Sequence, residues 1–214
     1  MRTLAIIGSG DLGQQIAHFA ISDNHYEKVV FFDDFTQEKS VGGFSIIGKS
    51  SDVEQKFKEN RFDELIIAIG YNHMSTRTNI YKRFKDEIPF GRLIHSTTHV
   101  DVTAKIAEGV VIYPACVIDA YVEIEANVLI NIGSLVAHHS IVGAHSFLSP
   151  RVAIAGFSKI GKCCILGINS TIIDNIKIKE NSKLGAGAVV IKNLNESGLY
   201  VGNPVRFIRA HDSI

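Results

Sequence analysis

Residues 124–154 read IEANVL, INIGSL, VAHHSI, VGAHSF, LSPRVA and I when they are written six at a time. A branched aliphatic residue opens every block, and the same phase continues without a slip from Val100 to Val190. By chance, such an unbroken run is expected on the order of once in ten million sequences, so the period reflects structure. The aliphatic positions are Val100, Ile106, Ile112, Ile118, Ile124, Ile130, Val136, Val142, Leu148, Ile154, Ile160, Leu166, Ile172, Ile178, Leu184 and Val190.

A second constraint follows four residues after each aliphatic, where almost every residue is small or β-branched. A six-residue period is too short for a helical hairpin and too regular for a β-sandwich. It suits a prism in which each of three faces is one short strand and the aliphatic side chains fill the interior. We therefore predict a parallel β-helix of about five turns. The small residue should lie where the chain bends, and a glycine after the aliphatic, such as Gly143 or Gly161, should give the turn conformational freedom.

The first 95 residues have a different pattern, in which short apolar runs alternate with helix-like stretches. The order of strand, glycine turn and helix is typical of a small Rossmann-like parallel sheet. The expected strands are Thr3–Ile7, Lys28–Phe32 and Glu64–Ile69, and the expected helices are Gln14–Ala20 and Thr76–Lys85.

Glycine and polar residues follow each of these three strands, at the edge where parallel sheets bind ligands. The segments are Gly8-Ser9-Gly10-Asp11-Leu12-Gly13, Asp33-Asp34 and Gly70-Tyr71-Asn72. Glycines let a diphosphate approach the backbone, and the following helix offers free N–H groups. A tight turn without a ligand explains the glycines alone, but the three segments together favour a nucleotide. NAD is the first guess from this pattern, yet nothing downstream resembles a domain for hydride chemistry.

The composition argues against a nucleic-acid-binding, a membrane or a secreted protein. Lys plus Arg and Asp plus Glu number 22 each, so no overall field favours nucleic acid or an anionic membrane. Cys116, Cys163 and Cys164 have no zinc-type spacing and an odd count, which is typical of small buried residues in a reducing compartment. No apolar run reaches the roughly 18 residues of a membrane span, and the N-terminus does not resemble a signal peptide. We expect a cytoplasmic protein with two domains, residues 1–95 and 96–214.

The hexapeptide repeat, with the terminal segments Leu184–Val190 and Gly202-Asn203-Pro204-Val205, resembles the left-handed β-helix acyltransferases. Together with the N-terminal Gly-Ser-Gly-Asp-Leu-Gly turn, the chain resembles the NeuD and PglD branch of bacterial sugar acyltransferases. This resemblance implies a homotrimer that transfers an acetyl group from acetyl-CoA to a nucleotide-linked 4-amino-4,6-dideoxy sugar, for the synthesis of a surface glycan or polysaccharide. It also implies an active site between neighbouring chains.

The resemblance places a catalytic histidine at His138, within Val136–Gly143. Histidine suits a general base because it titrates near neutrality. The family has an acidic residue beside this histidine, and here His139 replaces it. Asn131 corresponds to a family asparagine near the site, although an ordinary turn asparagine is an equally good interpretation. His145 is expected at the surface, outside the site.

The resemblance also implies the ligand contacts. Phe147 stands where the family has a second histidine near the acetyl donor, and Gly156 stands where a backbone N–H holds the thioester oxygen. Ile168 and Ala186 correspond to positions lining the coenzyme A groove, with plain packing as the alternative. On the acceptor side, the implied contacts with the sugar nucleotide are Gly8, Gly10, Asp11, Leu12, Asp33, Asp34, Gly70 and Asn72.

Three other functions remain open at this stage. O-acetylation of a sugar such as a sialic acid is the nearest, since a hydroxyl acceptor needs the same parts but stronger help from a base. A metal-dependent β-helix of the carbonic anhydrase kind is suggested by the number of histidines in the coil, although that family lacks such an N-terminal domain. A non-catalytic scaffold or sensor is the third.

Overall fold

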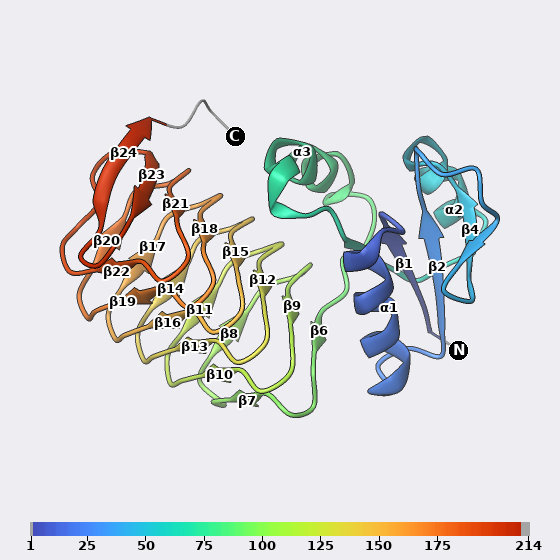
Figure 1. The fold of residues 1–214 in the computed structure, drawn as a ribbon. Helices are drawn as coiled ribbons and strands as arrows, with labels where there is room; N and C mark the ends of the chain where they lie inside the picture. The colour runs from blue at the N-terminus through green and yellow to red at the C-terminus, as the bar shows by residue number, and fades with distance from the viewer. Residues whose placement is uncertain (1, 211–214) are drawn as a thin grey trace. The chain divides into compact units, whose positions relative to one another are not determined.

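The computed structural model of the chain describes residues 2–210. The chain divides into two compact units, Met1–Leu93 and Ile94–Ile214. Each unit has its own strands and its own buried core, and Figure 1 shows helices only in the first.

The first unit is built on a sheet with the strand order β3-β4-β2-β1-β5. β1 lies at its centre and pairs in parallel with β2 on one side and β5 on the other. The strands are β1 (Thr3–Ile7), β2 (Lys28–Phe32), β3 (Ser40–Val41), β4 (Phe44–Gly48) and β5 (Glu64–Ile67). The helices are α1 (Asp11–Ser22), α2 (Val53–Lys58) and α3 (Met74–Phe84), with short 3₁₀ turns η1 (Ser50–Asp52) and η2 (Tyr71–His73).

The expected α/β arrangement is confirmed, and the antiparallel β3-β4 pair is an addition to it. The two strands turn at Gly42-Gly43, both with positive φ. A Gly-Gly pair is a signal for a two-residue hairpin, but β3 is only two residues long, so the sequence analysis did not identify it or the apolar strand β4 that follows.

The second unit is the predicted left-handed β-helix, drawn as stacked coils in Figure 1. Strands 18 residues apart pair in parallel, as Val117 does with Leu135, so three hexads make one turn. We call its three faces sheets 1, 2 and 3. Sheet 1 is β7 (His99–Val100), β10 (Val117–Ile118), β13 (Leu135–Val136), β16 (Ala153–Ile154), β19 (Thr171–Ile172) and β22 (Val189–Val190). Sheet 2 is β8 (Lys105–Ile106), β11 (Glu123–Ile124), β14 (Ile141–Val142), β17 (Lys159–Ile160) and β20 (Lys177–Ile178). Sheet 3 is β6 (Leu93–Ile94), β9 (Val111–Ile112), β12 (Leu129–Ile130), β15 (Phe147–Leu148), β18 (Ile165–Leu166), β21 (Lys183–Leu184), β23 (Gly198–Val201) and β24 (Arg206–Ala210).

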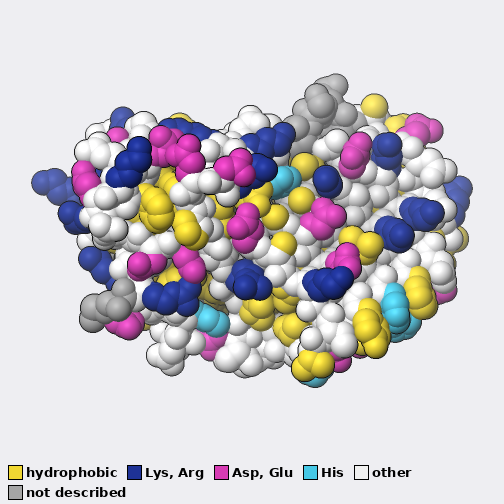
Figure 2. Space-filling model, turned by 180° about the vertical axis from the view of Figure 1, so that it is seen from behind, with side chains coloured by type: hydrophobic (Ala, Val, Ile, Leu, Met, Phe, Trp, Pro, Cys, Tyr) yellow, Lys and Arg dark blue, Asp and Glu magenta, His cyan; other side chains and the backbone are white. Residues whose placement is uncertain are grey.

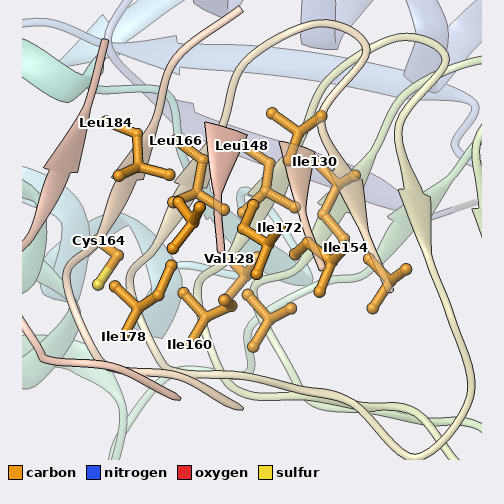
Figure 3. Packing of buried hydrophobic residues seen from close by; sticks show 14 of the residues in the cluster. Val128, Ile130, Leu148, Ile154, Ile160, Cys164, Leu166, Ile172, Ile178 and Leu184 are labelled. Carbon is orange, nitrogen blue, oxygen red and sulfur yellow. The ribbon is translucent and has the colours of Figure 1, made fainter. Parts of the chain in front are cut away.

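The predicted aliphatic is the second residue of each coil strand, and its side chain points into the coil. Figure 3 shows Ile130, Leu148 and Leu166 from one sheet meeting Ile154, Ile172 and Ile160 from the others. These residues are at most 2% exposed. Each fully buried aliphatic contributes about 1.5–3 kcal/mol through the hydrophobic effect, so the repeat itself supplies the core.

The expectation about the turn glycines is wrong. The left-handed residue of each corner lies three positions after the aliphatic, and it is seldom glycine; Tyr121, His139 and Phe157 all have φ of 58°. Gly143 and Gly161 are needed for another reason. A β-carbon on Gly143 would lie 2.6 Å from the carbonyl carbon of Gly161, and one on Gly161 would lie 2.4 Å from the amide nitrogen of Glu180. These glycines permit close stacking of successive coils.

The small residue after each corner is explained by hydrogen bonds between coils. Ser140 Oγ donates to the carbonyl of Ala155 at 3.0 Å and accepts from the amide of Ser158 at 3.1 Å. A buried hydroxyl with both partners in place costs little, so this position accepts serine as well as apolar residues.

Among the helices of residues 2–210, none combines the length and the apolar character needed to cross a membrane.

Candidate active site

His138 and His139 project from the corner between sheets 1 and 2. Val136 is anchored in the core, and the chain turns through Ala137–Ser140 before β14 begins. Both histidines are exposed, and their Nδ1 atoms lie 3.3 Å apart. Figure 2 shows histidine side chains between hydrophobic ones along one rim of the coil. Exposed imidazoles on a rigid frame can exchange protons with a bound molecule.

Gly156 lies one coil above His138, and the imidazole rests against it. A β-carbon at Gly156 would lie 2.6 Å from Cε1 and 2.9 Å from Nε2 of His138. The ring of Phe157 meets the same imidazole edge-on, with centroids 5.1 Å apart. The sequence-predicted pair His138 and Gly156 is therefore brought together on one corner.

Asp119 holds the backbone of this corner. Its Oδ2 accepts a hydrogen bond from the amide of His138 at 3.2 Å, and its Oδ1 accepts one from the amide of Ala120 at 2.7 Å. The carboxylate therefore holds the backbone of His138 in place and makes no hydrogen bond with its ring. Asp119 was missed from the sequence, although it lies about one coil before His138.

Asn131 does not join His138 within one chain. It follows β12 and occupies the corner between sheets 3 and 1, whereas His138 follows β13 and occupies the next corner. Its Oδ1 accepts a hydrogen bond from the amide of Ile132 at 2.8 Å, as in an ordinary turn.

Ile168 and Ala186 share the corner of Asn131. Both are exposed and lie one coil apart, where the amide of Gly187 donates to the carbonyl of Ile168 at 2.8 Å. Phe147, the fourth residue expected near the donor, lies on β15 in sheet 3 and is 5% exposed. The two groups of candidates therefore flank sheet 1 on opposite sides.

His145 was expected at the surface, and that expectation is wrong. It takes the left-handed position of the third corner and is only 8% exposed. Its Nδ1 lies 3.0 Å from the Nδ2 of Asn127, the residue in the same position one coil earlier. Lateral stacking of corners buries the ring, and a hexad pattern read along the chain does not report it.

The glycine turn of the first unit lies at the carboxyl end of the central strand β1. Gly8 has φ of 102°, and a β-carbon there would lie 2.8 Å from the carbonyl oxygen of Ala68, just beyond β5. Gly10 is the N-cap residue of α1, and a β-carbon on it would meet nothing within 4 Å. The first residues of α1 follow, with Asp11 exposed and Leu12 half-buried. The start of α1 is therefore accessible to an anion.

Asp33 organises the neighbouring loop after β2. Its Oδ2 accepts from the amide and the hydroxyl of Ser9, at 2.8 and 2.7 Å, and its Oδ1 accepts from the amides of Phe35 and Thr36. Burial raises the pKa of Asp33, but these hydrogen bonds outweigh burial and hold the pKa below its ordinary value. All four acceptor positions of the carboxylate are thus in use, and its expected contact with a base or ribose stays a prediction.

The other expected contacts also lie near the ends of β2 and β5. Asp34 accepts hydrogen bonds from the amide and the hydroxyl of Ser50, at 2.8 and 2.7 Å. Gly70 is the N-cap residue of η2, which contains the exposed Asn72. The sequence reading missed Phe35, whose side chain is 93% exposed beside Asp33. The sequence carries no signal for this residue, because phenylalanine is usually buried and only the tertiary structure shows its ring exposed.

Between residues 2 and 210, no three His, Cys, Asp or Glu side chains are grouped as a metal ion would require.

Two protein families match this chain, one within the first unit and one within the second. Residues 3–84 match the family described as PglD N-terminal domain. Residues 157–192 match the family described as bacterial transferase hexapeptide, six repeats. The chain joins a PglD N-terminal domain to transferase hexapeptide repeats. The resemblance to the NeuD and PglD proteins is thereby confirmed.

Solved structures resemble this PglD-type chain over nearly its whole length. The acetyltransferase domain of PglB from Neisseria gonorrhoeae FA1090 is 27% identical, with a TM-score of 0.91 over 97% of this chain and 100% of that one. The same domain in complex with acetyl coenzyme A is 25% identical, with a TM-score of 0.90 over 97% and 99%. PerB from Caulobacter crescentus, in complex with CoA and GDP-perosamine, is 25% identical, with a TM-score of 0.87 over 98% of both chains.

Curated relatives match over shorter stretches. UDP-3-O-acylglucosamine N-acyltransferase from Delftia acidovorans is 28% identical over 97 residues, which is 38% of this chain and 29% of that protein. The chain thus spans less than a third of the length of these first relatives.

Proposed function

We propose that this PglD-type chain transfers an acetyl group from acetyl-CoA to the amine of a nucleotide-linked 4-amino-4,6-dideoxy sugar, with His138 as the general base. The observation that carries the proposal is the exposed imidazole of His138, seated against Gly156 on a hexapeptide coil. The solved relatives include one with acetyl coenzyme A and one with CoA and GDP-perosamine. We infer that the product would serve the synthesis of a surface glycan, and we propose the cytoplasm as the location of the reaction.

The chemistry assigned to the corner is proton transfer. As the sugar amine forms a bond to the acetyl carbon and the carbon–sulfur bond breaks, the amine nitrogen must lose a proton. His138 accepts that proton and returns it to the leaving thiolate. The bound thioester supplies an activated acyl group, and the amide of Gly156 is the proposed donor to its oxygen.

Coenzyme A is proposed to lie along the corner of Ile168 and Ala186. At Gly187 a β-carbon would meet no atom within 4 Å, so this corner has room for a thin pantetheine arm. Asn131, on the same corner, and Phe147, on sheet 3, are kept as proposed contacts. On the acceptor side, the start of α1 at Gly10 suits the diphosphate, and Phe35 suits stacking with the base.

A homotrimer is proposed because the candidates occupy two corners of one chain. Sheet 1 lies between these corners and presents Val117 and Leu135 outward, each about two-fifths exposed. Ile132, Ile168 and Phe157 extend the exposed apolar surface onto the corners. A patch of this kind is typical of a contact between subunits. Cyclic packing would bring the His138 corner of one chain to the Ile168 corner of the next.

The function is tested by coenzyme A release from acetyl-CoA with an amino sugar nucleotide and with its hydroxyl counterpart. We expect turnover with the amine and little with the hydroxyl; the reverse would favour O-acetylation, and the absence of both would favour a binding protein. The variant His138→Ala should lose about 100-fold or more in kcat. Its Kd for coenzyme A should stay within a few fold. A variant that keeps most of its turnover would remove His138 from the role of base.

A further inference from the structure

The partner of the His138 imidazole is the imidazole of the next residue. The two Nδ1 atoms are 3.3 Å apart, and the ring planes meet at 85°. Two neutral imidazoles in this arrangement share a single hydrogen bond, in which one Nδ1 carries the proton and the other accepts it. The direction of that bond decides whether Nε2 of His138 has a free lone pair.

The ring of His139 is held by the coils on either side of it. It stacks on Phe157 with centroids 4.9 Å apart and planes at 22°, and it packs against Tyr121 at 4.8 Å and 36°. These residues stand 18 positions after and before His139, in the same left-handed position of their own coils. Residues other than glycine hold this left-handed position at most corners of the coil, so what distinguishes these three corners is that their rings pack against one another.

Carboxylates near the pair are engaged elsewhere. Asp119 accepts from the backbone amides of His138 and Ala120. Asp174, on the coil after Gly156, accepts from the side-chain amide of Asn175 at 2.8 Å. The phenol ring of Tyr121 faces His139. Lys105 and Glu123 line the same pocket as His139, and they form an ion pair with each other at 3.0 Å. Within residues 2–210, the hydrogen bond recorded for the His138 imidazole is therefore the one to His139.

We propose that His139 is a positioning residue whose Nδ1 accepts the Nδ1–H of His138, so that Nε2 of His138 carries the lone pair that takes the amine proton. The inference rests on the proposed function and explains how the site works without an acidic neighbour. A neutral acceptor fixes the tautomer as a carboxylate does, but it adds no negative charge to stabilise the imidazolium. In place of a charged partner, His138 has a neutral one whose ring is held in position by its packing against Tyr121 and Phe157.

The direction of the bond is measured by ¹⁵N NMR of histidine-labelled protein, with His138 assigned through the His138→Ala variant. We expect the Nδ1–H tautomer at His138 near pH 8. In His139→Phe the ring stack is kept and the acceptor is removed. Phenylalanine already adopts this backbone conformation at position 157, so the variant should fold. His138 should then revert toward the Nε2–H tautomer. An Nε2–H tautomer in the unaltered protein, or no change in His139→Phe, would overturn the proposal.

Kinetics provide a second readout. His139→Phe should lower kcat about tenfold with KM within about twofold, because binding groups are untouched. His139→Glu should restore much of the kcat that His139→Phe loses and move the acidic limb of the pH profile upward by about one unit, since a carboxylate stabilises the imidazolium. An unchanged pH profile in His139→Glu would contradict the proposal. If no amine is acetylated at all, the proposed function fails, and the NMR spectrum alone decides the pairing.

Discussion

The imidazole of His138 takes the space where a side chain on Gly156 would begin. The atoms of the imidazole that a β-carbon would meet, Cε1 and Nε2, are at the far end of a movable side chain. A larger residue at position 156 therefore displaces the ring at little cost to the fold.

Gly156→Ala should lower kcat by about tenfold or more while changing the free energy of unfolding by less than about 1 kcal/mol. Turnover and chemical denaturation measure the two effects. In the His138→Ala background, the same substitution should have no further effect on kcat, because the displaced group is gone. An additive loss in the double variant would show that Gly156 acts independently of His138.

Asp33 uses its charge to hold a loop in place, by accepting hydrogen bonds from the residues around it. Its folded-state pKa lies below the ordinary value of 3.8. The carboxylate therefore stabilises the folded unit above that value, and the stabilisation is lost as the pH falls through the lower folded pKa.

Asp33→Asn should lower the melting temperature at neutral pH, because an amide cannot accept from all four donors. The difference in melting temperature between the variant and the unaltered chain should shrink as the pH falls from roughly 5 to 2. Thermal melts over this range measure it. A difference that is independent of pH would mean that the charge of Asp33 contributes nothing.

At the scale of the coil, substitution should destabilise the fold to different extents at two kinds of glycine. Gly161 lies between stacked backbones, with a would-be β-carbon 2.4 Å from the amide nitrogen of Glu180. Gly133 occupies a left-handed corner with φ of 68°, and its nearest neighbour, Cγ of Arg151, would be 3.6 Å away. Backbone cannot move aside as a side chain can, so close packing matters more than φ here.

Gly161→Ala should therefore destabilise the chain by about 1–3 kcal/mol. Gly133→Asn should cost only a few tenths of a kcal/mol, since asparagine tolerates left-handed φ and takes the same position at Asn169. Denaturant unfolding compares the two. Equal losses would contradict this account of the coil glycines.

For the whole molecule, the proposed trimer explains why sheet 1 presents apolar side chains while sheet 2 presents charged ones. The outward residues of sheet 2 include Lys105, Glu123, Lys159 and Lys177, against Val117 and Leu135 on sheet 1. A buried lysine without a partner is costly, whereas a lysine at an open surface is not.

Light scattering should give about three times the 23.4 kDa chain mass for the unaltered protein. Leu135→Lys should shift the mass toward a single chain and abolish turnover. Lys159→Glu, on sheet 2, should do neither. A single-chain mass for the unaltered protein would overturn both the trimer and the two-corner site.

The sequence by itself determined the coil. The interior of the coil excludes water and accepts only apolar side chains, and every sixth residue points into it, so the sequence shows a six-residue period. It also indicated the α/β unit, because apolar strands that alternate with helix-like stretches are typical of a small parallel sheet. The tertiary structure decided which residues are neighbours across coils. Residues 18 apart become adjacent only when three sheets close a turn, and this closure stacked Tyr121, His139 and Phe157, buried His145, and put Asn131 on a different corner from His138. Stacking and hydrogen bonding across coils depend on side-chain directions, which a period along the chain does not encode.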